Sequence, residues 1–424
     1  MGVSLPLPRR AVIVAVGSEL LTPSRADTNS LFITSKLNDL GIEVVAKVIV
    51  GDRRDELAAV VGESLRRSDL VVLTGGLGPT DDDVTRLAVS DALGLPLDDD
   101  PEILERIRQR FARRGMEMPA VNRVQAQVLR GATVLPNANG TAPGQWLERG
   151  AQAVVLLPGP PREMRPMFEA VLAERLQTLA RGARLHRRVI KIAGRTESDV
   201  EQVTQPVYSR FAAWQPPVAT SILAAPGQIE LHLSIRANRA EEAESALARA
   251  TSEILAVVGG DVFSTDGRSL EQVVGDLLRR RGWRIATAES CTGGLVASRL
   301  TDVPGSSDYV ERGVVAYSNR AKTDLLGVPE RLMLEHGAVS EPVGEAMAAG
   351  MRERARVEVA VGVTGIAGPG GGSESKPVGT VAVAVAWPSG TVVRRYLFPG
   401  GREQVKWVAS QTALNMVRQV LQER

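Results

Sequence analysis

The chain alternates between short runs of consecutive apolar residues and longer segments in which apolar residues recur every three or four positions. Runs of the first kind predict buried strands, and the spacing of the second kind predicts helices with one buried face. In the first part of the chain, strands are predicted at 11–16, 44–50 and 69–74, with helices at 31–40 and 55–67 between them. This order predicts a doubly wound, mostly parallel sheet with helices on both faces, and hence the α/β class.

The middle of the chain follows a different pattern. Strands are predicted at 186–193, 218–223 and 228–236, and helices at 197–210 and 240–258. The second and third strands are separated by Ala-Pro-Gly, so we expect them to pair as a hairpin. The order strand–helix–strand–strand–helix predicts a small α+β module, whose expected role is that of a spacer or a dimer contact.

In the last part of the chain, strands and helices alternate again after a helix at 270–281 that ends at Gly282. The further predicted elements are strands at 283–286, 313–317 and 357–363, helices at 295–300 and 401–421, and a hairpin of 378–387 with 391–398. We therefore expect three domains, which cover residues 1–175, 176–265 and 266–424, and the last of them is again α/β.

Composition places the chain among ordinary globular proteins. Of its 424 residues, 44% are hydrophobic and 24% are charged. The net charge is +2 and aromatic residues make up 4%, which gives neither the basic field nor the stacking surface of a nucleic-acid-binding protein. No apolar run reaches ~18 residues, and no secretory signal precedes the first strand, so we expect a cytoplasmic protein without membrane contact.

The scarcity of cysteine and histidine limits the possible chemistry. Cys291 is the only cysteine, which excludes an intrachain disulfide and a cysteine-based zinc site. The sequence has three histidines, so catalysis by a histidine-rich site is not expected.

Acidic loops follow the predicted strands of the first domain. Ligands bind parallel sheets beyond the carboxyl ends of the strands, where these loops lie. The carboxylates of Glu19, Asp27, Asp82 and Asp83 suit Mg²⁺ or a similar divalent ion, which could bridge phosphate oxygens and activate water. The alternative is that the run of aspartates only caps the helix that follows it.

Other loops of the first domain are expected to line the same pocket. The glycines at 75, 76 and 78 can turn backbone N–H groups toward a phosphate. Arg162 could clamp a phosphate, or it could be an exposed arginine at the start of a helix. The candidate ligand-binding residues of this domain are Gly75, Gly76, Gly78, Thr80, Asn139, Gly140, Thr141, Gly159 and Arg162.

In the last domain, Ser290 lies between the predicted strand at 283–286 and the predicted helix at 295–300. The first N–H groups of a helix lack intrahelical partners and can hold an anion or a developing oxyanion. Gly293 and Gly294 would let a ligand approach the backbone closely. The alternative is a helix cap rich in serine and threonine.

A serine nucleophile needs a base, and no histidine lies in a matching loop. Lys322, Thr364 and Arg402 all lie at ends of predicted elements. A lysine whose pKa is lowered by burial can act as the base, which makes Lys322 the candidate. Cys291 is a rival nucleophile by its chemistry, but adjacent side chains do not normally reach one site, so we expect it to pack as a small apolar residue.

Several motifs of the first domain together resemble the CinA (competence/damage-inducible) family. They are Gly-Ser-Glu-Leu-Leu at 17–21, Gly-Gly-Leu-Gly-Pro-Thr-Asp-Asp-Asp-Val-Thr at 75–85, Asn-Gly-Thr-Ala-Pro-Gly at 139–144 and Leu-Pro-Gly-Pro-Pro at 157–161. The first departs from the family's usual Gly-Thr-Glu-Leu-Leu, and the glycine that commonly follows it is absent. The resemblance implies a molybdopterin-binding-like domain that cleaves ADP-ribose with a divalent ion, with K⁺ as a second ion. It also implies a KH-type middle domain, although the Gly-x-x-Gly loop of an RNA-binding KH domain is missing from this sequence.

The last domain is similar to the family's nicotinamide mononucleotide deamidase domain over nearly all of residues 270–405. The matching motifs include Ala-Glu-Ser-Cys-Thr-Gly-Gly at 288–294, Tyr-Ser-Asn-x-x-Lys at 317–322 and Thr-Gly-Ile-Ala-Gly-Pro at 364–369. By position, the resemblance makes Ser290 the nucleophile and Lys322 its base, and it puts Ser307 and Tyr317 beside the amide. The implied substrate-binding residues are Thr292, Gly293, Thr364, Gly365 and Arg402, with Arg402 at the phosphate.

The resemblance therefore implies a bifunctional hydrolase of pyridine-nucleotide salvage, assembled as a homodimer. One site would deamidate nicotinamide mononucleotide without a cofactor, and the other would cleave ADP-ribose with a metal ion. The alternative is a non-enzymatic module that binds a nucleotide or molybdopterin as a scaffold in competence or the response to DNA damage.

Overall fold

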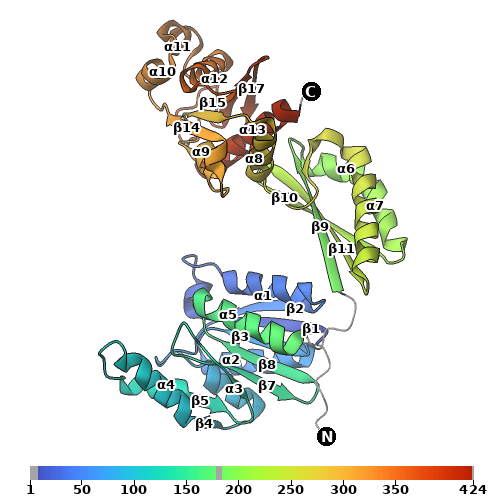
Figure 1. The fold of residues 1–424 in the computed structure, drawn as a ribbon, viewed down its shortest axis with the longest axis vertical. Helices are drawn as coiled ribbons and strands as arrows, with labels where there is room; N and C mark the ends of the chain where they lie inside the picture. Colours follow the sequence, from blue (N-terminus) through green and yellow to red (C-terminus); the bar gives the residue numbers. More distant parts are fainter. Residues whose placement is uncertain (1–7, 178–183, 423–424) are drawn as a thin grey trace. The chain divides into compact units, whose positions relative to one another are not determined.

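The computed structural model describes residues 8–177 and 184–422, and these form two compact units. The first unit ends at His186 and also takes in Arg236–Ala240. The second unit holds Arg187–Ile235 and the chain from Glu241 onward. Figure 1 shows the sheets and helices of both units.

The first unit is built on a six-stranded sheet in the order β2-β1-β3-β8-β7-β6. The first four strands of this order run parallel, and β7 and β6 run antiparallel to their neighbours. The strands are β1 (Arg10–Val16), β2 (Glu43–Val50), β3 (Leu70–Thr74), β6 (Thr133–Leu135), β7 (Gly144–Arg149) and β8 (Gln152–Leu157). The mostly parallel α/β sheet predicted from the sequence is confirmed.

Helices cover both faces of this sheet. One core contains Ile13 with α1 and α5, and the other contains Val12 and Val14 with α2 and α3. Burial on both faces explains why β1 is a continuous apolar run without alternation. The helices are α1 (Thr28–Asp39), α2 (Arg54–Arg67), α3 (Thr85–Leu93), α4 (Pro101–Ala112) and α5 (Pro161–Val171), and a small two-stranded sheet joins β4 (Leu97–Asp99) to β5 (Gln127–Leu129).

The middle module is a four-stranded sheet in the order β10-β11-β9-β12 with two helices. The predicted hairpin is present, with Val218 opposite Ile235 in antiparallel register. The elements are β9 (Arg184–Ala193), α6 (Glu197–Tyr208), β10 (Val218–Ala225), β11 (Gln228–Ala237), α7 (Ala240–Val258) and β12 (Val262–Ser264). The sequence did not predict β12, because three residues are too few to show a period.

The C-terminal domain has a mixed sheet in the order β14-β13-β15-β16-β17, in which β14, β13 and β15 are parallel and the last two strands antiparallel. The strands are β13 (Ile285–Glu289), β14 (Val310–Val315), β15 (Val359–Gly365), β16 (Thr380–Trp387) and β17 (Gly390–Leu397). The prediction of a strand at 283–286 was wrong by about half its length, because β13 continues through the buried polar residues Thr287 and Glu289.

Helices again cover both faces of the C-terminal sheet (Figure 1). One core contains α8, α9 and α13, and the other contains α10, α11 and α12. These helices are α8 (Leu270–Arg281), α9 (Leu295–Thr301), α10 (Asn319–Leu326), α11 (Glu330–His336), α12 (Glu341–Ala355) and α13 (Arg402–Gln422). The carboxyl ends of β13, β14 and β15 therefore meet at one edge of the sheet.

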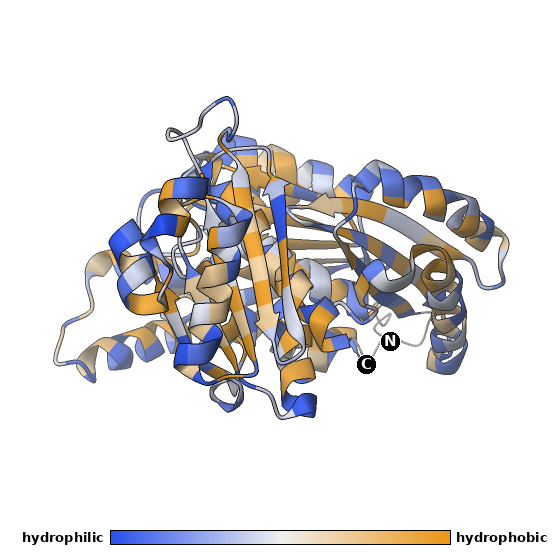
Figure 2. Ribbon diagram, turned by 90° about the horizontal axis from the view of Figure 1, so that it is seen from above, coloured by the Kyte–Doolittle hydropathy of each residue, from blue (hydrophilic) through white to orange (hydrophobic). Residues whose placement is uncertain are grey.

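The hydropathy of the chain follows this layering. In Figure 2 several helices carry a hydrophobic stripe beside a hydrophilic one, as expected for helices that pack on a sheet with one face. Among the described residues, no helix is long and apolar enough to cross a membrane.

Candidate active sites

Ser290 lies at the edge of the C-terminal sheet where its parallel strands end. It follows β13 directly, and its backbone N–H donates to the carbonyl of Val363 in β15 at 2.9 Å. On the other side, the N–H of Ala316 donates to the carbonyl of Glu289 at 2.8 Å. Ser290 and Tyr317 follow β13 and β14, and Thr364 lies near the end of β15, which is the arrangement expected of a ligand site in such a sheet.

Lys322 contacts the Ser290 side chain directly. Its Nζ lies 3.1 Å from Ser290 Oγ, 3.1 Å from the carbonyl oxygen of Ala316 and 3.2 Å from that of Tyr317. The side chain is buried, with 2% exposure, and this loss of water lowers the pKa of Lys322 from 10.5. Ser318 caps α10 by accepting from the N–H of Ala321, which fixes the helix that carries the lysine.

Cys291 is packed away from this pair. A Cβ placed on Gly365 would come within 2.9 Å of Cys291 Sγ, so the thiol fills the space that the glycine leaves. Burial raises the pKa of the Cys291 thiol to about 12. Because the thiolate is the reactive form of cysteine, a thiol that stays protonated at neutral pH is a poor nucleophile.

The start of α9 is occupied by a carboxylate, which corrects one prediction from the sequence. The N–H groups of Val296 and Ala297 donate to the two carboxylate oxygens of Glu289 at 3.0 and 2.9 Å, and Thr287 Oγ1 donates to the same group at 3.2 Å. These N–H groups are therefore not free to hold an oxyanion. An acidic residue ahead of a predicted helix could have indicated this cap, but Glu289 is the last residue of β13 and was not recognised as a capping residue.

The turn between Ser290 and α9 provides other polar groups. Gly293 and Gly294 have φ values of 64° and 93°, which fit the left-handed region that favours glycine. The Thr292 hydroxyl is fully buried and has no hydrogen-bond partner among the described residues. Lys406 Nζ lies 3.6 Å from the position that a Cβ on Gly293 would take, so a cation from α13 lies over this turn.

Arg402 and Lys406 lie one turn apart on α13. Arg402 Nη1 donates to the carbonyl of Gly368 at 2.8 Å, and its Nη2 donates to the hydroxyl of Tyr317 at 3.1 Å. The Thr364 hydroxyl donates to the carbonyl of Ala338 at 2.8 Å, so it holds a neighbouring loop in place. The sequence interpretation missed Lys406, although its spacing of four from Arg402 puts both on one helix face.

Ser307 is not brought to this edge within one chain. It lies in a single 3-10 turn, Ser306–Asp308, ahead of β14, and Val310 pairs with Ile285 at the start of β13. The length of β14 separates it from Ala316, a distance of about 16 Å at ~3.3 Å per residue. The described chain therefore does not bring Ser307 to Ser290, and the role of Ser307 beside the amide stays a prediction.

In the first unit, the glycine-rich and acidic loops surround one cavity of about 400 Å³, which we call the acidic cavity. Of the predicted residues, it is lined by Glu19, Gly75, Gly76, Gly78, Asp82, Asp83, Thr141 and Gly159. Three further polar residues line it that the sequence did not single out, namely Asp52, Gln125 and Glu163. The loops come from the ends of β1, β2, β3 and β8, which is why residues far apart in the chain meet here.

The glycines of this cavity serve the packing of the loop. The N–H of Gly75 donates to the carbonyl of Leu157 at 3.0 Å, so it cannot also donate to a phosphate as predicted. A Cβ on Gly75 would lie 2.2 Å from the carbonyl oxygen of Val16. The buried guanidinium of Arg86 donates to the carbonyls of Leu77 and Gly78, and burial lowers its pKa to about 10, so it stays charged at neutral pH.

Three of the four predicted metal ligands line the acidic cavity, and Asp27 does not. Asp27 accepts from the N–H of Ser30 at the start of α1 and lines a neighbouring hollow. Asp83 accepts from the N–H and the hydroxyl of Thr80, which closes the turn 80–83. Within residues 8–177 and 184–422, no group of three or more histidine, cysteine or acidic side chains is arranged to hold a metal ion. The carboxylates of the acidic cavity still suit Mg²⁺, which commonly takes one or two protein carboxylates together with substrate phosphates.

Four of the predicted ligand-binding residues do not line the acidic cavity: Thr80, Asn139, Gly140 and Arg162. Asn139 Nδ2 donates to the carbonyl of Arg162 at 2.8 Å, which ties the loop to the start of α5. The Arg162 side chain is exposed in the first turn of that helix, in keeping with the alternative interpretation. A Cβ on Gly140 would collide with Glu163, so this glycine allows the loop to lie against α5.

Comparison with protein families gives three matches along the chain. Residues 12–178 match the model described as a probable molybdopterin binding domain. Residues 187–264 match the KH domain of the damage-inducible protein CinA, and residues 267–421 match the CinA C-terminal domain.

Relatives of similar length match nearly the whole chain. A CinA-like protein of Koribacter versatilis is 47% identical over 97% of this chain and 99% of its own length. A putative competence-damage inducible protein of Symbiobacterium thermophilum is 44% identical over 97% of this chain and 98% of its own. Among solved structures, the competence/damage inducible protein CihA from Agrobacterium tumefaciens is 42% identical and covers 36% of this chain and 94% of its own, with a TM-score of 0.36.

Proposed function

Because the chain belongs to the CinA family, we propose that its C-terminal domain hydrolyses the carboxamide of nicotinamide mononucleotide. The products would be nicotinate mononucleotide and ammonia. The observation that carries this proposal is the hydrogen bond between Lys322 and Ser290, made by a buried lysine whose pKa is lowered. A serine with a neutral amine beside it is equipped to form an acyl-enzyme.

The surroundings of Lys322 suit the neutral amine. A neutral amine has two N–H bonds, and the carbonyls of Ala316 and Tyr317 can accept both. Its lone pair then faces the hydroxyl of Ser290. In the proposed reaction Lys322 takes the hydroxyl proton as Oγ attacks the amide carbon, and it returns this proton to the departing nitrogen as ammonia. Water then attacks the ester in the same way and releases the carboxylate product.

The cations on α13 support a substrate with a phosphate group. Lys406 lies over the turn that follows Ser290, and Arg402, one helical turn earlier, donates to the hydroxyl of Tyr317. Two positive charges at one side of the nucleophile favour a substrate that carries an anion at the end opposite the reacting amide.

For the first unit, the proposal is a metal-dependent ADP-ribose pyrophosphatase that yields AMP and ribose 5-phosphate. Support comes from the acidic cavity, whose lining includes Glu19, Asp52, Asp82, Asp83 and Glu163. A divalent ion would supply charge neutralisation at the diphosphate and a more acidic water. One or two carboxylates of the cavity, such as Glu19 and Asp82, would hold it together with the substrate phosphates, and the 75–83 loop braced by Arg86 would shape the site.

The deamidase proposal is tested by incubating the full chain with nicotinamide mononucleotide and measuring ammonia. Nicotinamide riboside, which lacks the phosphate, serves as the matched substrate. We expect ammonia from both, with a higher KM for the riboside because it cannot use Arg402 and Lys406. Release of no ammonia from the mononucleotide by folded protein would leave the non-enzymatic scaffold as the better explanation.

A further inference from the structure

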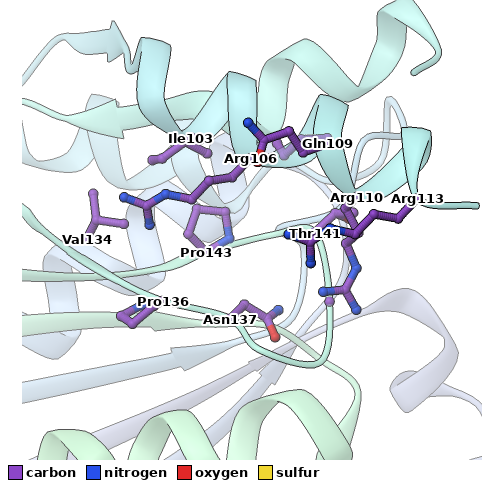
Figure 3. A pocket seen from close by; sticks show the side chains of 12 residues that line it. Ile103, Arg106, Gln109, Arg110, Arg113, Val134, Pro136, Asn137, Thr141 and Pro143 are labelled. Atoms are coloured by element: carbon purple, nitrogen blue, oxygen red, sulfur yellow. The ribbon is translucent and has the colours of Figure 1, made fainter. Parts of the chain in front are cut away.

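A second cavity, of about 200 Å³, lies beside the acidic cavity and has the opposite charge. We call it the basic cavity. Two arginines of α4, Arg106 and Arg110, line it together with Arg113, which follows the helix, and the segment 134–143 forms its other wall (Figure 3). Among the described residues that line it there is no aspartate or glutamate, and among those that line the acidic cavity there is no lysine or arginine.

The arginines are not neutralised by close carboxylates. The guanidinium of Arg110 is half-buried and donates to the backbone carbonyl of Ala138 at 3.1 Å. Arg113 makes no ion pair among the described residues, and Arg106 has only a pair with Glu102 in which both side chains are largely exposed. An exposed ion pair of this kind is weak because water screens it, so the Arg106–Glu102 pair leaves the cavity with a positive potential.

The floor and rim of the basic cavity strengthen this field. Ile103, Ile107 and Val134 line the apolar part of the cavity, and apolar walls raise the strength of electrostatic contacts beside them. Figure 3 shows the arginine side chains leaving α4 on the side that faces Val134, Pro136, Asn137 and Thr141. Arginine is also the cation whose planar group matches phosphate geometry best.

The two cavities share a wall. Thr141 lines both of them, and Asn137, which lines the basic cavity, donates from Nδ2 to Glu163 of the acidic cavity at 2.8 Å. The basic cavity is smaller than the roughly 300–1,000 Å³ of sites that hold a whole small-molecule ligand. It therefore fits one group of a ligand whose remainder lies in the acidic cavity or in solvent.

We propose that the basic cavity is a phosphate subsite, which binds one of the two phosphates of the nucleotide while the other phosphate lies at the acidic cavity. This proposal rests on the nucleotide substrate proposed for the first unit. In this arrangement the carboxylates of the acidic cavity bind one phosphate through a cation. The arginines of the basic cavity, on the other side of Thr141, bind the second phosphate directly.

The test is calorimetric titration of the full chain with AMP in low salt and excess chelator. Without a divalent ion the acidic cavity repels AMP, so the part of AMP binding that is lost when the cavity's arginines are replaced reports the basic cavity. Arg110→Gln combined with Arg113→Gln should raise the Kd for AMP about tenfold or more, since a charge-assisted hydrogen bond contributes on that order. Arg108→Gln is the matched control, because Arg108 lies on the same helix but does not line the cavity, and it should leave the Kd unchanged.

Adenosine and inorganic phosphate separate the parts of AMP. We expect phosphate to compete with AMP and adenosine not to compete. An unchanged Kd in the double variant, or no AMP binding by the wild type, would overturn the subsite. Hydrolysis of ADP-ribose is measured in parallel, where the double variant should show a raised KM. If AMP binding depends on the arginines but the wild type does not cleave ADP-ribose, the subsite stands and the pyrophosphatase proposal fails.

Discussion

At the scale of single residues, the chemistry of the C-terminal site depends on whether Lys322 can lose its proton. Lysine normally carries a charge at neutral pH and cannot act as a base. Here the side chain is 98% buried, and its hydrogen-bond partners are carbonyls and a hydroxyl, without a carboxylate to hold the charge. Both features favour the neutral amine.

Lys322→Arg should remove this base while keeping a long cationic side chain, because a guanidinium keeps its proton at any accessible pH. We expect kcat for deamidation to fall by about 10²–10⁴-fold, the usual contribution of a general base. Lys376→Arg is the control, since Lys376 is only partly buried and its Nζ donates to the carbonyl of His336, away from Ser290. Thermal melts of both variants check the fold, and a fully active Lys322→Arg enzyme would rule out lysine as the base.

The pH dependence of deamidation follows from the same lysine. Its pKa is lowered from 10.5 by burial, and the active form is the neutral amine. Activity should therefore rise with pH through a pKa below 10.5 and level off above it. The measurement is kcat/KM for nicotinamide mononucleotide from pH 6 to pH 10. A profile that falls across this range would contradict a lysine base.

At the scale of elements, Glu289 links the turn at 290–294 to the start of α9. It ends β13, accepts from the first N–H groups of α9, and lies next to Ser290 in the chain. Glu289→Gln should lower the free energy of unfolding by about 1–2 kcal/mol, because the helix start loses a charged cap. Asp302→Asn, at the exposed opposite end of α9, should leave it nearly unchanged. Urea unfolding of both variants gives the comparison, and equal stability of the two would argue against the cap.

The elements also show where the sequence was informative. The continuous apolar run of β1 and the helical period of α2 were predicted closely, because burial on a sheet dictates their apolar positions. β13 was misplaced because two of its buried residues, Thr287 and Glu289, are polar. The short strands β6 and β12 were missed, since three residues form strands only with the support of neighbouring strands.

The Ser290 site, like the fold, was predicted only in part from the sequence. The pairing of Ser290 with Lys322 was expected from their places at the ends of predicted elements and from the family resemblance, and the structure brings the two side chains together. Two features of the site depend on strand register, which local sequence patterns do not reveal. One is that Glu289 accepts from the N–H groups of α9, and the other is the distance between Ser307 and Ser290. Lys406 lies in α13, more than a hundred residues from Gly293 in the sequence. Its contact with the turn at Gly293 depends on tertiary packing, so the sequence did not predict it.

At the scale of the whole molecule, the two candidate sites lie in different units and differ in chemistry. The acidic cavity needs a divalent ion to accept a diphosphate, whereas the Ser290 site has a base of its own. A chelator should therefore abolish ADP-ribose cleavage and leave deamidation within about twofold, which parallel assays with and without added Mg²⁺ would measure. Equal loss of both activities would contradict two independent sites.

The central claim is that Ser290, and not its neighbour Cys291, attacks the amide. The most direct measurement is the initial rate of ammonia release from nicotinamide mononucleotide by Ser290→Ala and Cys291→Ala, with nucleotide binding measured for both. Ser290→Ala should lose activity about a thousandfold or more while still binding nucleotide. Cys291→Ala should stay within a few-fold of wild type, because the buried thiol remains protonated. An active Ser290→Ala enzyme beside an inactive Cys291→Ala enzyme would contradict the account and make the cysteine the nucleophile.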